Sequence, residues 1–289
     1  MNRVLAFRFD VDSVRCIEQG IPKLAAVARA HDVRFTFFVN MGYSFNWSHN
    51  LRHFARKYFT PSTTSRPQTV AHSLPTSRKL GVGGVLKTVL LNPRLGDRYR
   101  KTFDELFRAG HELALHGGTD HVIWQRSLHR LSKDELTALF RPAYETFTAR
   151  YGRPVGFACP GFVHNDDVLR LLDEYRFAYS SDMPGVEPFR PRLEDGQTCS
   201  HYQVPVNVMG AGNVPIIEEM LSLGGAHDQI VARCVEEIRG RDFALLYGHP
   251  YVEGVHADIV DEVIRRVKPD FQILPVRDYL ARWKGARGG

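Results

Sequence analysis

The stretch VLAFRFDVD, residues 4–12, decides the fold class. Its apolar and aromatic residues predict a strand over residues 4–10, with two carboxylates, Asp10 and Asp12, at its end. Side chains two residues apart on a strand point to the same face, so these carboxylates are expected to be neighbours. A lone pair of this kind is more often a turn acid and a helix cap than a catalytic pair. The pair therefore needs partners from elsewhere in the chain.

Short apolar runs of this kind recur along the chain, and longer helical patterns separate them. The predicted strands cover residues 4–10, 34–39, 112–116, 156–159, 178–182, 203–206, 243–247 and 272–274. The predicted helices cover residues 21–31, 99–109, 132–151, 166–175, 228–239, 257–267 and 276–283. This alternation is typical of βα units around a parallel sheet. Eight strands predict an α/β fold, either a complete barrel or a distorted one.

Length and composition favour one domain over residues 1–289. The chain has 289 residues and is 43% hydrophobic, which suits a single α/β barrel. It shows no apolar run near the roughly 20 residues that span a bilayer and no secretion signal pattern, so a cytoplasmic location is expected. The cysteines contain no CxxC pair and are expected to be reduced thiols. They are Cys16, Cys159, Cys199 and Cys234.

Residues 43–95 interrupt the barrel rhythm with one long basic insertion. Between Asn46 and Lys101 the only acidic residue is Asp97, while lysine and arginine recur throughout. Basic segments that also carry apolar residues can lie in a membrane interface, and anionic lipids attract them. The expected partner is therefore an anionic membrane surface, and a solvated flap packed on the barrel is the alternative. Nucleic acid is not expected, because no recognised binding motif accompanies the charge.

Three further predicted strands end in residues that can bind a metal or transfer protons. LHGGTDH places His116 and His121 after one strand, YSSD places Asp182 after another, and LLYGH places His249 after a third. Any one of these histidines alone is more often solvent-facing or hydrogen-bonded within the fold than catalytic. Barrel enzymes, however, carry their active sites where the strands end, so the joint pattern indicates an active site.

The first two strand ends also suggest a metal site. Neutral imidazole is the commonest metal ligand, and Asp12 with His116 and His121 makes a set of two histidines and one carboxylate. Such a set leaves coordination positions open, as a catalytic site requires. One divalent ion is expected. Zinc is the first candidate, and cobalt, nickel, manganese or iron also suit these ligands.

The order of these motifs resembles a known family. FDVD, HGGTDH, FACPGF, YSSD and LLYGH follow one another as do the motifs of the NodB-type polysaccharide deacetylases, carbohydrate esterase family 4. FRFDVDSVRCIEQGIPKL, YSSDMPGVEPFRPRLEDG and HPYVEG resemble more narrowly the members that deformylate undecaprenyl-phosphate-linked formamido-arabinose. The resemblance implies a distorted (β/α) barrel that hydrolyses linear amide bonds.

The resemblance also implies roles for the strand-end residues. Asp10 would be the catalytic base, His249 the acid, and Asp12, His116 and His121 the metal ligands. The family's two histidines usually lie four residues apart, and here the interval is five. The intervening glycines, residues 117 and 118, can adopt positive φ and let the loop bulge. The sequence leaves open whether this interval preserves metal binding.

Further residues are assigned supporting roles. Backbone N–H groups near Gly161 and Phe162 are expected to hold the oxyanion, and Asp182 to orient a site residue. Arg15 and Arg190 are candidates to meet a substrate phosphate near the barrel mouth.

The function expected is removal of an N-formyl or N-acetyl group from an amino sugar. The sugar would be linked to a polyprenyl phosphate at the inner face of the cytoplasmic membrane, during modification of lipopolysaccharide or another envelope glycan. One alternative is a deacetylase of soluble chito-oligosaccharides or peptidoglycan. The other is a sugar-binding pseudoenzyme whose histidine spacing has abolished metal binding. The sequence does not decide between formyl and acetyl, the sugar and its carrier, or the oligomeric state.

Overall fold

The protein is built around one parallel β-sheet that curls into an incomplete barrel. The computed structural model describes residues 3–43 and 93–287. Its strands are β1 (Arg3–Val11), β2 (Thr36–Val39), β3 (Glu112–His116), β4 (Gly156–Ala158), β5 (Tyr179–Ser180), β6 (Tyr202–Gln203), β7 (Phe243–Gly248) and β8 (Phe271–Ile273). They are arranged in the order β6-β5-β4-β3-β2-β1-β7, with β8 paired to the first residues of β1. The predicted distorted α/β barrel is confirmed.

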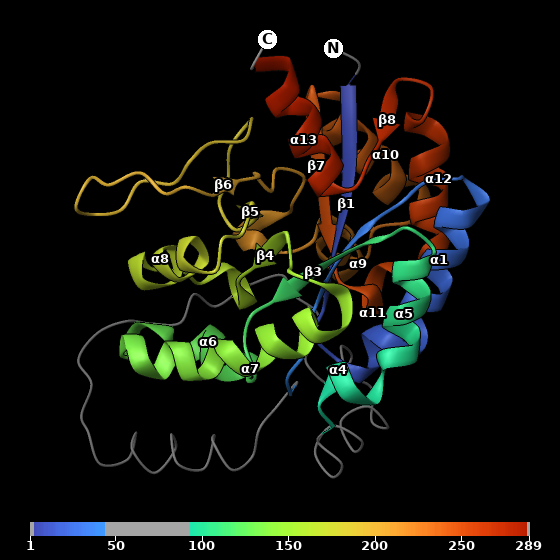
Figure 1. Ribbon diagram of the computed structural model, residues 1–289. Helices are drawn as coiled ribbons and strands as arrows, with labels where there is room; N and C mark the ends of the chain where they lie inside the picture. Colours follow the sequence, from blue (N-terminus) through green and yellow to red (C-terminus); the bar gives the residue numbers. More distant parts are fainter. Residues whose placement is uncertain (1–2, 44–92, 288–289) are drawn as a thin grey trace.

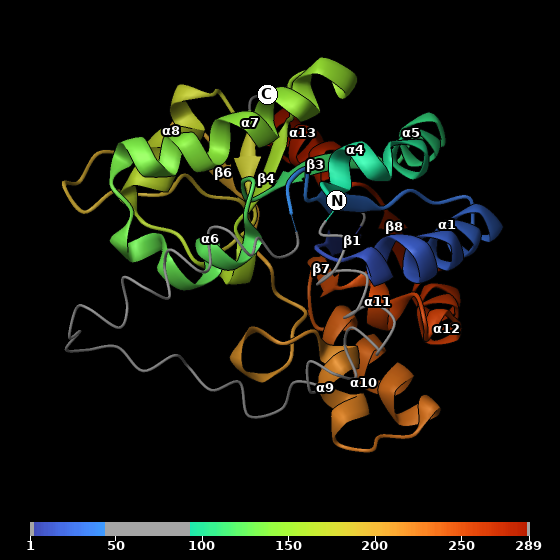
Figure 2. The ribbon, with the colours of Figure 1, turned by 90° about the horizontal axis from the view of Figure 1, so that it is seen from below.

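Helices cover the outside of this sheet (Figures 1 and 2). They are α1 (Ile21–Ala30), α4 (Leu95–Arg98), α5 (Arg100–Arg108), α6 (His121–Ser127), α7 (Lys133–Tyr151), α8 (Asp166–Glu174), α9 (Ile216–Ser222), α10 (His227–Arg239), α11 (Pro250–Glu253), α12 (Ala257–Val267) and α13 (Val276–Arg287). Every predicted helix is present within two residues at its start, and all but the C-terminal one also at its end. The predicted helix at 276–283 instead continues to Arg287. The short helices α4, α6, α9 and α11 were not predicted, because seven residues or fewer show little periodicity.

Strand β1 is central and buried on both faces. Leu5, Phe7 and Phe9 belong to the cluster that packs against the helices, whereas Val4 and Ala6 belong to a second cluster on the other face. The second cluster draws residues from β2, β3, β4, β5 and β7, so it fills the barrel interior. Even-numbered residues of β1 therefore point into the barrel, as the two-residue period of a strand requires.

The barrel has an irregular seam between β6 and β7. The strands predicted at 178–182 and 203–206 are shorter in the structure, and the chain after β6 crosses toward β7 instead. Val208 makes a parallel bridge with Leu246, and its N–H donates to Leu245 O over 3.1 Å. The Asn207 side chain accepts from Leu245 N at 2.8 Å and donates to Phe243 O at 2.9 Å. A side chain therefore replaces part of the missing backbone ladder.

Helix α13 closes the end of the barrel where the strands begin. The Tyr279 ring stacks on Phe243 with centroids 3.6 Å apart. The N–H of Val276 donates to Thr36 Oγ1 at 2.9 Å. Figure 1 shows α13 beside the start of β1, away from the end to which β1 points. Access to the barrel interior is therefore blocked at this end.

Most of the insertion predicted to face a membrane, residues 44–92, lies outside the described residues. Its two ends are described. Tyr43 forms an antiparallel bridge with Arg94 and a parallel bridge with Asp120. The insertion therefore leaves and rejoins the barrel at neighbouring points beside α6. No helix in the described ranges is both long enough and apolar enough to cross a membrane. All four cysteines, which were expected to be reduced thiols, are free and buried.

Candidate active site

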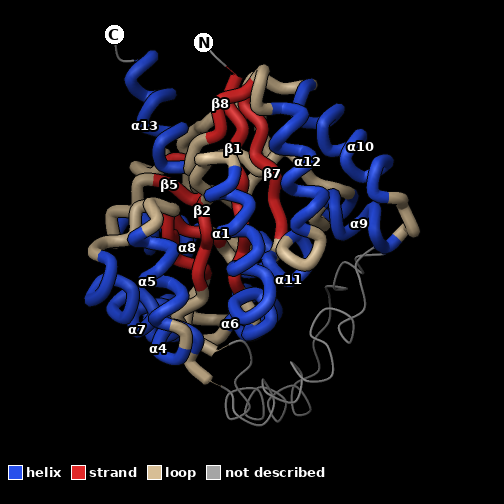
Figure 3. Tube along the Cα trace, turned by 90° about the vertical axis from the view of Figure 1, so that its right-hand side faces the viewer, coloured by secondary structure: helices blue, strands red, loops and turns tan. Residues whose placement is uncertain are grey.

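The strand-end residues predicted from the sequence meet at one place. Strands β1 and β7 end at the same end of the barrel, near α6 and α11 (Figure 3), and β3 ends there too because it runs parallel to them. There Asp12 Oδ2 lies 3.8 Å from His121 Nε2 and also 3.8 Å from His249 Nε2. His116 Nε2 lies 3.3 Å from His121 Nε2 and 4.0 Å from Asp10 Oδ2. Three separate strand ends thus form one cluster.

The cluster has a buried side and an open side. The side chains of Asp10 and His116 are only 3% and 2% exposed, whereas Asp12, His121 and His249 retain between 13% and 19%. Solvent therefore reaches the cluster from the side of Asp12, His121 and His249.

The loop between the two histidines bulges as expected. Gly117 has φ +65°, and a Cβ atom there would lie 2.5 Å from the Pro160 side chain. A Cβ atom on Gly118 would lie 2.5 Å from Leu139 O. Helix α6 then begins at His121, with Asp120 accepting from Ile123 N at 2.9 Å as its N-cap. The five-residue interval thus still brings both imidazoles together.

The donor set fits a divalent metal. His116 Nδ1 lies 3.0 Å from Ala158 O, so this nitrogen carries the proton and Nε2 presents a lone pair toward His121. Two nitrogens bound about 2.05 Å from a tetrahedral ion would be about 3.3 Å apart, which matches the separation of these Nε2 atoms. Burial lowers the pKa of His116 to about 4 and also lowers that of His121, which favours neutral ligands. Asp12 Oδ2, 3.8 Å from His121 Nε2, is the third donor of the set.

A buried arginine holds the Asp10 carboxylate. Arg8 Nε and Nη2 donate to the two Asp10 oxygens at 2.9 and 2.8 Å, and Nη1 donates to Ser181 O. Burial by itself would raise the pKa of Asp10, but Arg8 and His116 together hold that pKa below its ordinary value. Asp10 is therefore a carboxylate with a fixed orientation.

His249 lies among polar groups from β7, α9 and α11. Its Nε2 is 3.1 Å from Tyr247 Oη, and its backbone N–H donates to Glu253 Oε2 at 2.6 Å. Its Nδ1 is buried without a hydrogen bond in the described structure and lies 3.9 Å from Glu218 Oε2. Glu218 itself is fully buried. A carboxylate on this side of the ring is suited to orienting an imidazole whose other nitrogen transfers a proton.

Asp182, the predicted orienting residue, lies elsewhere in the site. Its Oδ1 accepts from Cys159 N at 2.7 Å, and its N–H donates to Gln203 Oε1 at 3.0 Å. Within the described residues no hydrogen bond joins it to a site histidine. Burial raises its pKa, and Arg8 opposes that rise. Asp182 thus fixes the loop after β4, while Glu218 faces His249.

The predicted oxyanion donors are only partly available. Gly161 and Phe162 both have left-handed backbones, with φ of 64° and 61°. The N–H of Phe162 already donates to Cys159 O at 3.0 Å. Its ring instead lies 5.0 Å from the Arg8 guanidinium. Phe162 therefore stays an oxyanion candidate only if this turn opens.

The two arginines proposed to bind a substrate phosphate, Arg15 and Arg190, lie in different parts of the barrel. Arg15 follows β1 and is partly buried, with its Nε 3.1 Å from Gln19 Oε1. Arg190 lies in the segment before β6, where its guanidinium is 5.0 Å from the Tyr202 ring. Tyr202 also contacts Trp283 of α13, which closes the opposite end of the barrel. Arg15 is placed near the cluster, and Arg190 is not.

One other group of possible metal donors exists in the described ranges. Ligand atoms of Asp173, Cys199 and His201 lie within 4.8 Å of one another. The Asp173 carboxylate, however, already accepts from Ser200 N and Oγ and from His201 N and Nδ1, at 2.6–3.0 Å. A carboxylate with four donors has little capacity left for an ion. We therefore interpret this group as a hydrogen-bonded anchor for the start of β6.

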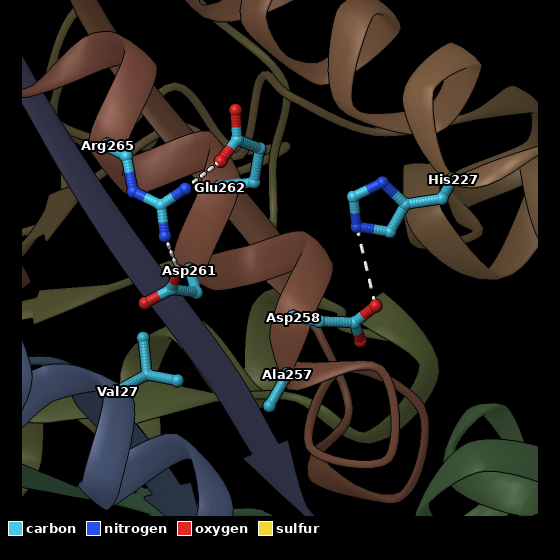
Figure 4. A pocket seen from close by; sticks show the side chains of 7 residues that line it. All are labelled: Val27, His227, Ala257, Asp258, Asp261, Glu262 and Arg265. Atoms are coloured by element: carbon cyan, nitrogen blue, oxygen red, sulfur yellow. Dashed lines mark hydrogen bonds and ion pairs between the residues drawn. The ribbon is translucent and has the colours of Figure 1, made fainter.

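The strand-end site is separate from a hollow on the outer helical layer. A surface hollow of about 400 Å³ lies among α1, α10 and α12 (Figure 4). Its polar groups pair with one another, as in the contact of 3.4 Å between His227 and Asp258 and the ion pairs from Arg265 to Asp261 and Glu262. It contains none of the strand-end residues, so the chemistry lies elsewhere.

Sequence reasoning missed Arg8 and Glu218. Arg8 could have been found, because it shares the alternating face of Asp10 and Asp12 and is the one charged residue inside the apolar run. Glu218 gave no comparable signal. It belongs to α9, 31 residues before His249, and only the folded chain brings the two together.

Comparison with known proteins agrees with this geometry. No family model matches the chain. The chain is 25% identical over 280 residues to a protein of Shewanella sediminis named as the 4-deoxy-4-formamido-L-arabinose-phosphoundecaprenol deformylase ArnD, covering 96% of this chain and 85% of that one. An ArnD protein of Wigglesworthia glossinidia brevipalpis is 28% identical over 148 residues, about half of each chain.

Solved structures share the fold. A polysaccharide deacetylase from Mycobacterium smegmatis superposes with a TM-score of 0.65 at 18% identity, covering 100% of this chain and 92% of that one. PuuE allantoinase superposes with a TM-score of 0.64 at 13% identity, covering 98% and 90%. At these identities the likeness shows the fold alone. Together with the ArnD relatives, it confirms the predicted resemblance: the chain has the fold of the polysaccharide deacetylases and is similar to an ArnD deformylase along nearly its whole length.

Proposed function

We propose that this protein removes an N-formyl or N-acetyl group from an amino sugar carried on a polyprenyl phosphate, and that it requires one divalent metal ion. The coarser statement, a hydrolase acting on amide bonds of amino sugars, rests on similarity to the deformylases and the shared fold. The observation that carries the proposal is the convergence of Asp12, His116 and His121, with Asp10 and His249 on either side.

Each residue of the site has a task in amide hydrolysis. When bound to Asp12, His116 and His121, a divalent ion would supply Lewis acidity toward the carbonyl and acidify water. Asp10 takes the proton of the attacking water, because its carboxylate is charged and rigidly held. His249 donates a proton to the departing nitrogen, and Glu218 keeps its ring oriented for that transfer. These two residues answer the two obstacles in amide hydrolysis, a weak nucleophile and a poor leaving group.

The lipid-linked substrate is proposed from the relatives. The name of the Shewanella sediminis relative specifies a formamido sugar on phosphoundecaprenol. The insertion begins and ends beside α6, at the edge of the site, so a membrane contact made by it would bring the site to such a lipid. On this proposal the protein acts at the inner face of the cytoplasmic membrane, with zinc as the first candidate ion.

The test compares lipid-linked with free sugars. Purified protein is assayed on formamido and acetamido forms of both, before and after removal of metal and after its return. Preference for the lipid-linked sugar, lost on chelation and restored by metal, supports the proposal. Preference for a free chito-oligosaccharide would instead favour the alternative function, deacetylation of soluble chito-oligosaccharides. Absence of bound metal and of turnover on every substrate would favour the pseudoenzyme. A Bacillus anthracis protein named as a pseudoenzyme shares this fold at 12% identity. The superposition covers 96% of this chain and 65% of that one, with a TM-score of 0.52.

A further inference from the structure

Arg8 is a fully buried cation in the interior of the barrel. It lies two residues before Asp10 on β1, so both side chains point to the same face. Burying an unpaired guanidinium is costly, so its surroundings must compensate the charge. Three kinds of contact do so here. Asp10 binds it through two parallel hydrogen bonds, Ser181 O accepts from its third nitrogen, and aromatic rings surround its carbon. An arginine in such a setting is held in one conformation.

The aromatic contacts come from three different elements. The guanidinium carbon lies 4.8 Å from the ring centroid of Phe38, 5.0 Å from Phe162 and 5.2 Å from Tyr247. Contacts of this length are favourable for a cation over a ring. Phe162 reaches its place with φ 61°, a conformation that costs free energy for a residue with a side chain. The fold accepts strain at Phe162 while its ring packs on Arg8.

The same arrangement fixes the direction of the Asp10 carboxylate. Two parallel N–H···O bonds set the plane of a carboxylate as well as its position, which a lysine cannot do. Held in that plane, Asp10 Oδ2 also faces His116 Nε2 over 4.0 Å. A displacement of about 1 Å in a catalytic group can lower the rate by about 10²-fold.

We propose that Arg8 is a positioning residue, which aims the Asp10 carboxylate at the reacting water and acts on the reaction only through Asp10. The inference rests on the proposed function, in which Asp10 is the base. It places the support of the base on the same strand as the base itself, two residues earlier. Neither side chain can then move without the other.

The experiment is a double-mutant cycle of Arg8→Lys and Asp10→Asn in the metal-loaded protein. Arg8→Lys keeps the charge and loses the two-pronged contact, so kcat is expected to fall by about 10- to 10³-fold while KM and metal content change little. In the Asp10→Asn background the same change is expected to cost almost nothing further, because the residue it acts through is already disabled. Equal losses in both backgrounds would overturn the proposal.

A matched control is available on the surface. Arg150 contacts Asp104 with the same two-pronged geometry, at 2.7 and 2.7 Å, between α5 and α7. Arg150→Lys is expected to leave kcat unchanged. Equal losses in Arg8→Lys and Arg150→Lys would indicate a general effect on the fold and would also overturn the proposal.

The result is separable from the outcome for the proposed function. If the wild-type protein turns over none of the amino sugars, the proposed function fails, and the Arg8 inference is tested by a crystal structure of the Arg8→Lys variant. A rotated Asp10 carboxylate in an otherwise unchanged fold supports it. An Asp10 carboxylate in its present plane without the arginine would overturn it.

Discussion

The two ends of the barrel treat buried polar groups in opposite ways. At the end where the strands begin, the buried Glu112 carboxylate accepts hydrogen bonds from Thr36 Oγ1, Tyr179 Oη and Arg277 N, all at 2.8–3.0 Å. Helix α13 covers this end, and the protein itself satisfies the Glu112 carboxylate there.

At the end where the strands finish, the polar groups face one another instead. The Nε2 atoms of His116 and His121 meet at 3.3 Å, and Asp12 Oδ2 lies 3.8 Å from two histidines. Imidazole nitrogens and a carboxylate that face one another in this way offer several donor atoms to one added ion. The comparison teaches that one end buries its carboxylate among hydrogen-bond donors of the fold, whereas the other gathers the side chains to which we assign the chemistry.

The largest expected effect is at the open end. His116→Ala should lose both bound metal and turnover, because it removes a ligand. Asp10→Asn should keep the metal and lower kcat by about 10²- to 10⁴-fold, because it removes only the base. Metal analysis and steady-state kinetics measure the two. Retention of metal by His116→Ala would refute the ligand assignment, and Asp104→Asn on the surface serves as control.

A smaller effect on rate is expected from Glu218. Glu218→Gln keeps the size of the side chain and removes the charge that faces His249 Nδ1, so kcat should fall by about 10-fold with metal content unchanged. In a His249→Ala background the change should have no further effect. An undiminished effect there would mean that Glu218 acts on something other than His249.

At the closed end the effect should appear in stability and not in turnover. Glu112→Gln leaves an N–H₂ group facing donors, so the free energy of unfolding should fall by about 1–3 kcal/mol while kcat is unchanged. Denaturant unfolding with parallel kinetics measures both. A loss of kcat without a loss of stability would contradict the claim that Glu112 stabilises the fold and takes no part in turnover.

The smallest effect concerns His111, just before β3. Burial, with a contribution from Arg34, lowers its pKa to about 4, and its Nδ1 accepts from Phe35 N at 3.0 Å. The unfolded chain, with a pKa of about 6.5, binds the proton first, so stability is fully present above that pH and declines as pH falls toward 4. Between pH 7 and 5.5 the loss should be about 1 kcal/mol.

The control for this prediction is His111→Gln in metal-free protein. In this variant the loss of stability between pH 7 and 5.5 should be smaller by about 1 kcal/mol. Some loss should remain, because burial also lowers the pKa of His116. Identical pH profiles for the wild type and the variant would contradict the account of His111.

Local patterns explain why so much of this site could be predicted from the sequence. Asp10 and Asp12 share a face because a strand alternates, and the ends of parallel strands meet, so His116 and His249 were expected near them. Spacing alone could not show that His121 would reach His116, because that depends on the turn at Gly117 and on where α6 begins. The fold followed from the alternation of strands and helices for the same local reason.

What could not be predicted depends on contacts between distant segments. Asp182 follows β5 as predicted, but no pattern in the sequence indicated that its carboxylate would accept from Cys159 N. Arg190 was expected at the barrel mouth and instead lies against Tyr202. Both residues lie in the long irregular segment between β5 and β6, for which the sequence offers no periodic signal.

The pairing of Tyr43 with Arg94 makes the long insertion an exchangeable module. The entropy of closing a loop grows slowly with its length, by about 0.6 kcal/mol for each doubling. Segments of very different length and composition can therefore be joined at these two positions without altering β2, α4 or the barrel core. A short glycine-serine bridge between Tyr43 and Arg94 would yield a barrel that retains its catalytic end, and a foreign segment grafted there would redirect the same chemistry to another surface.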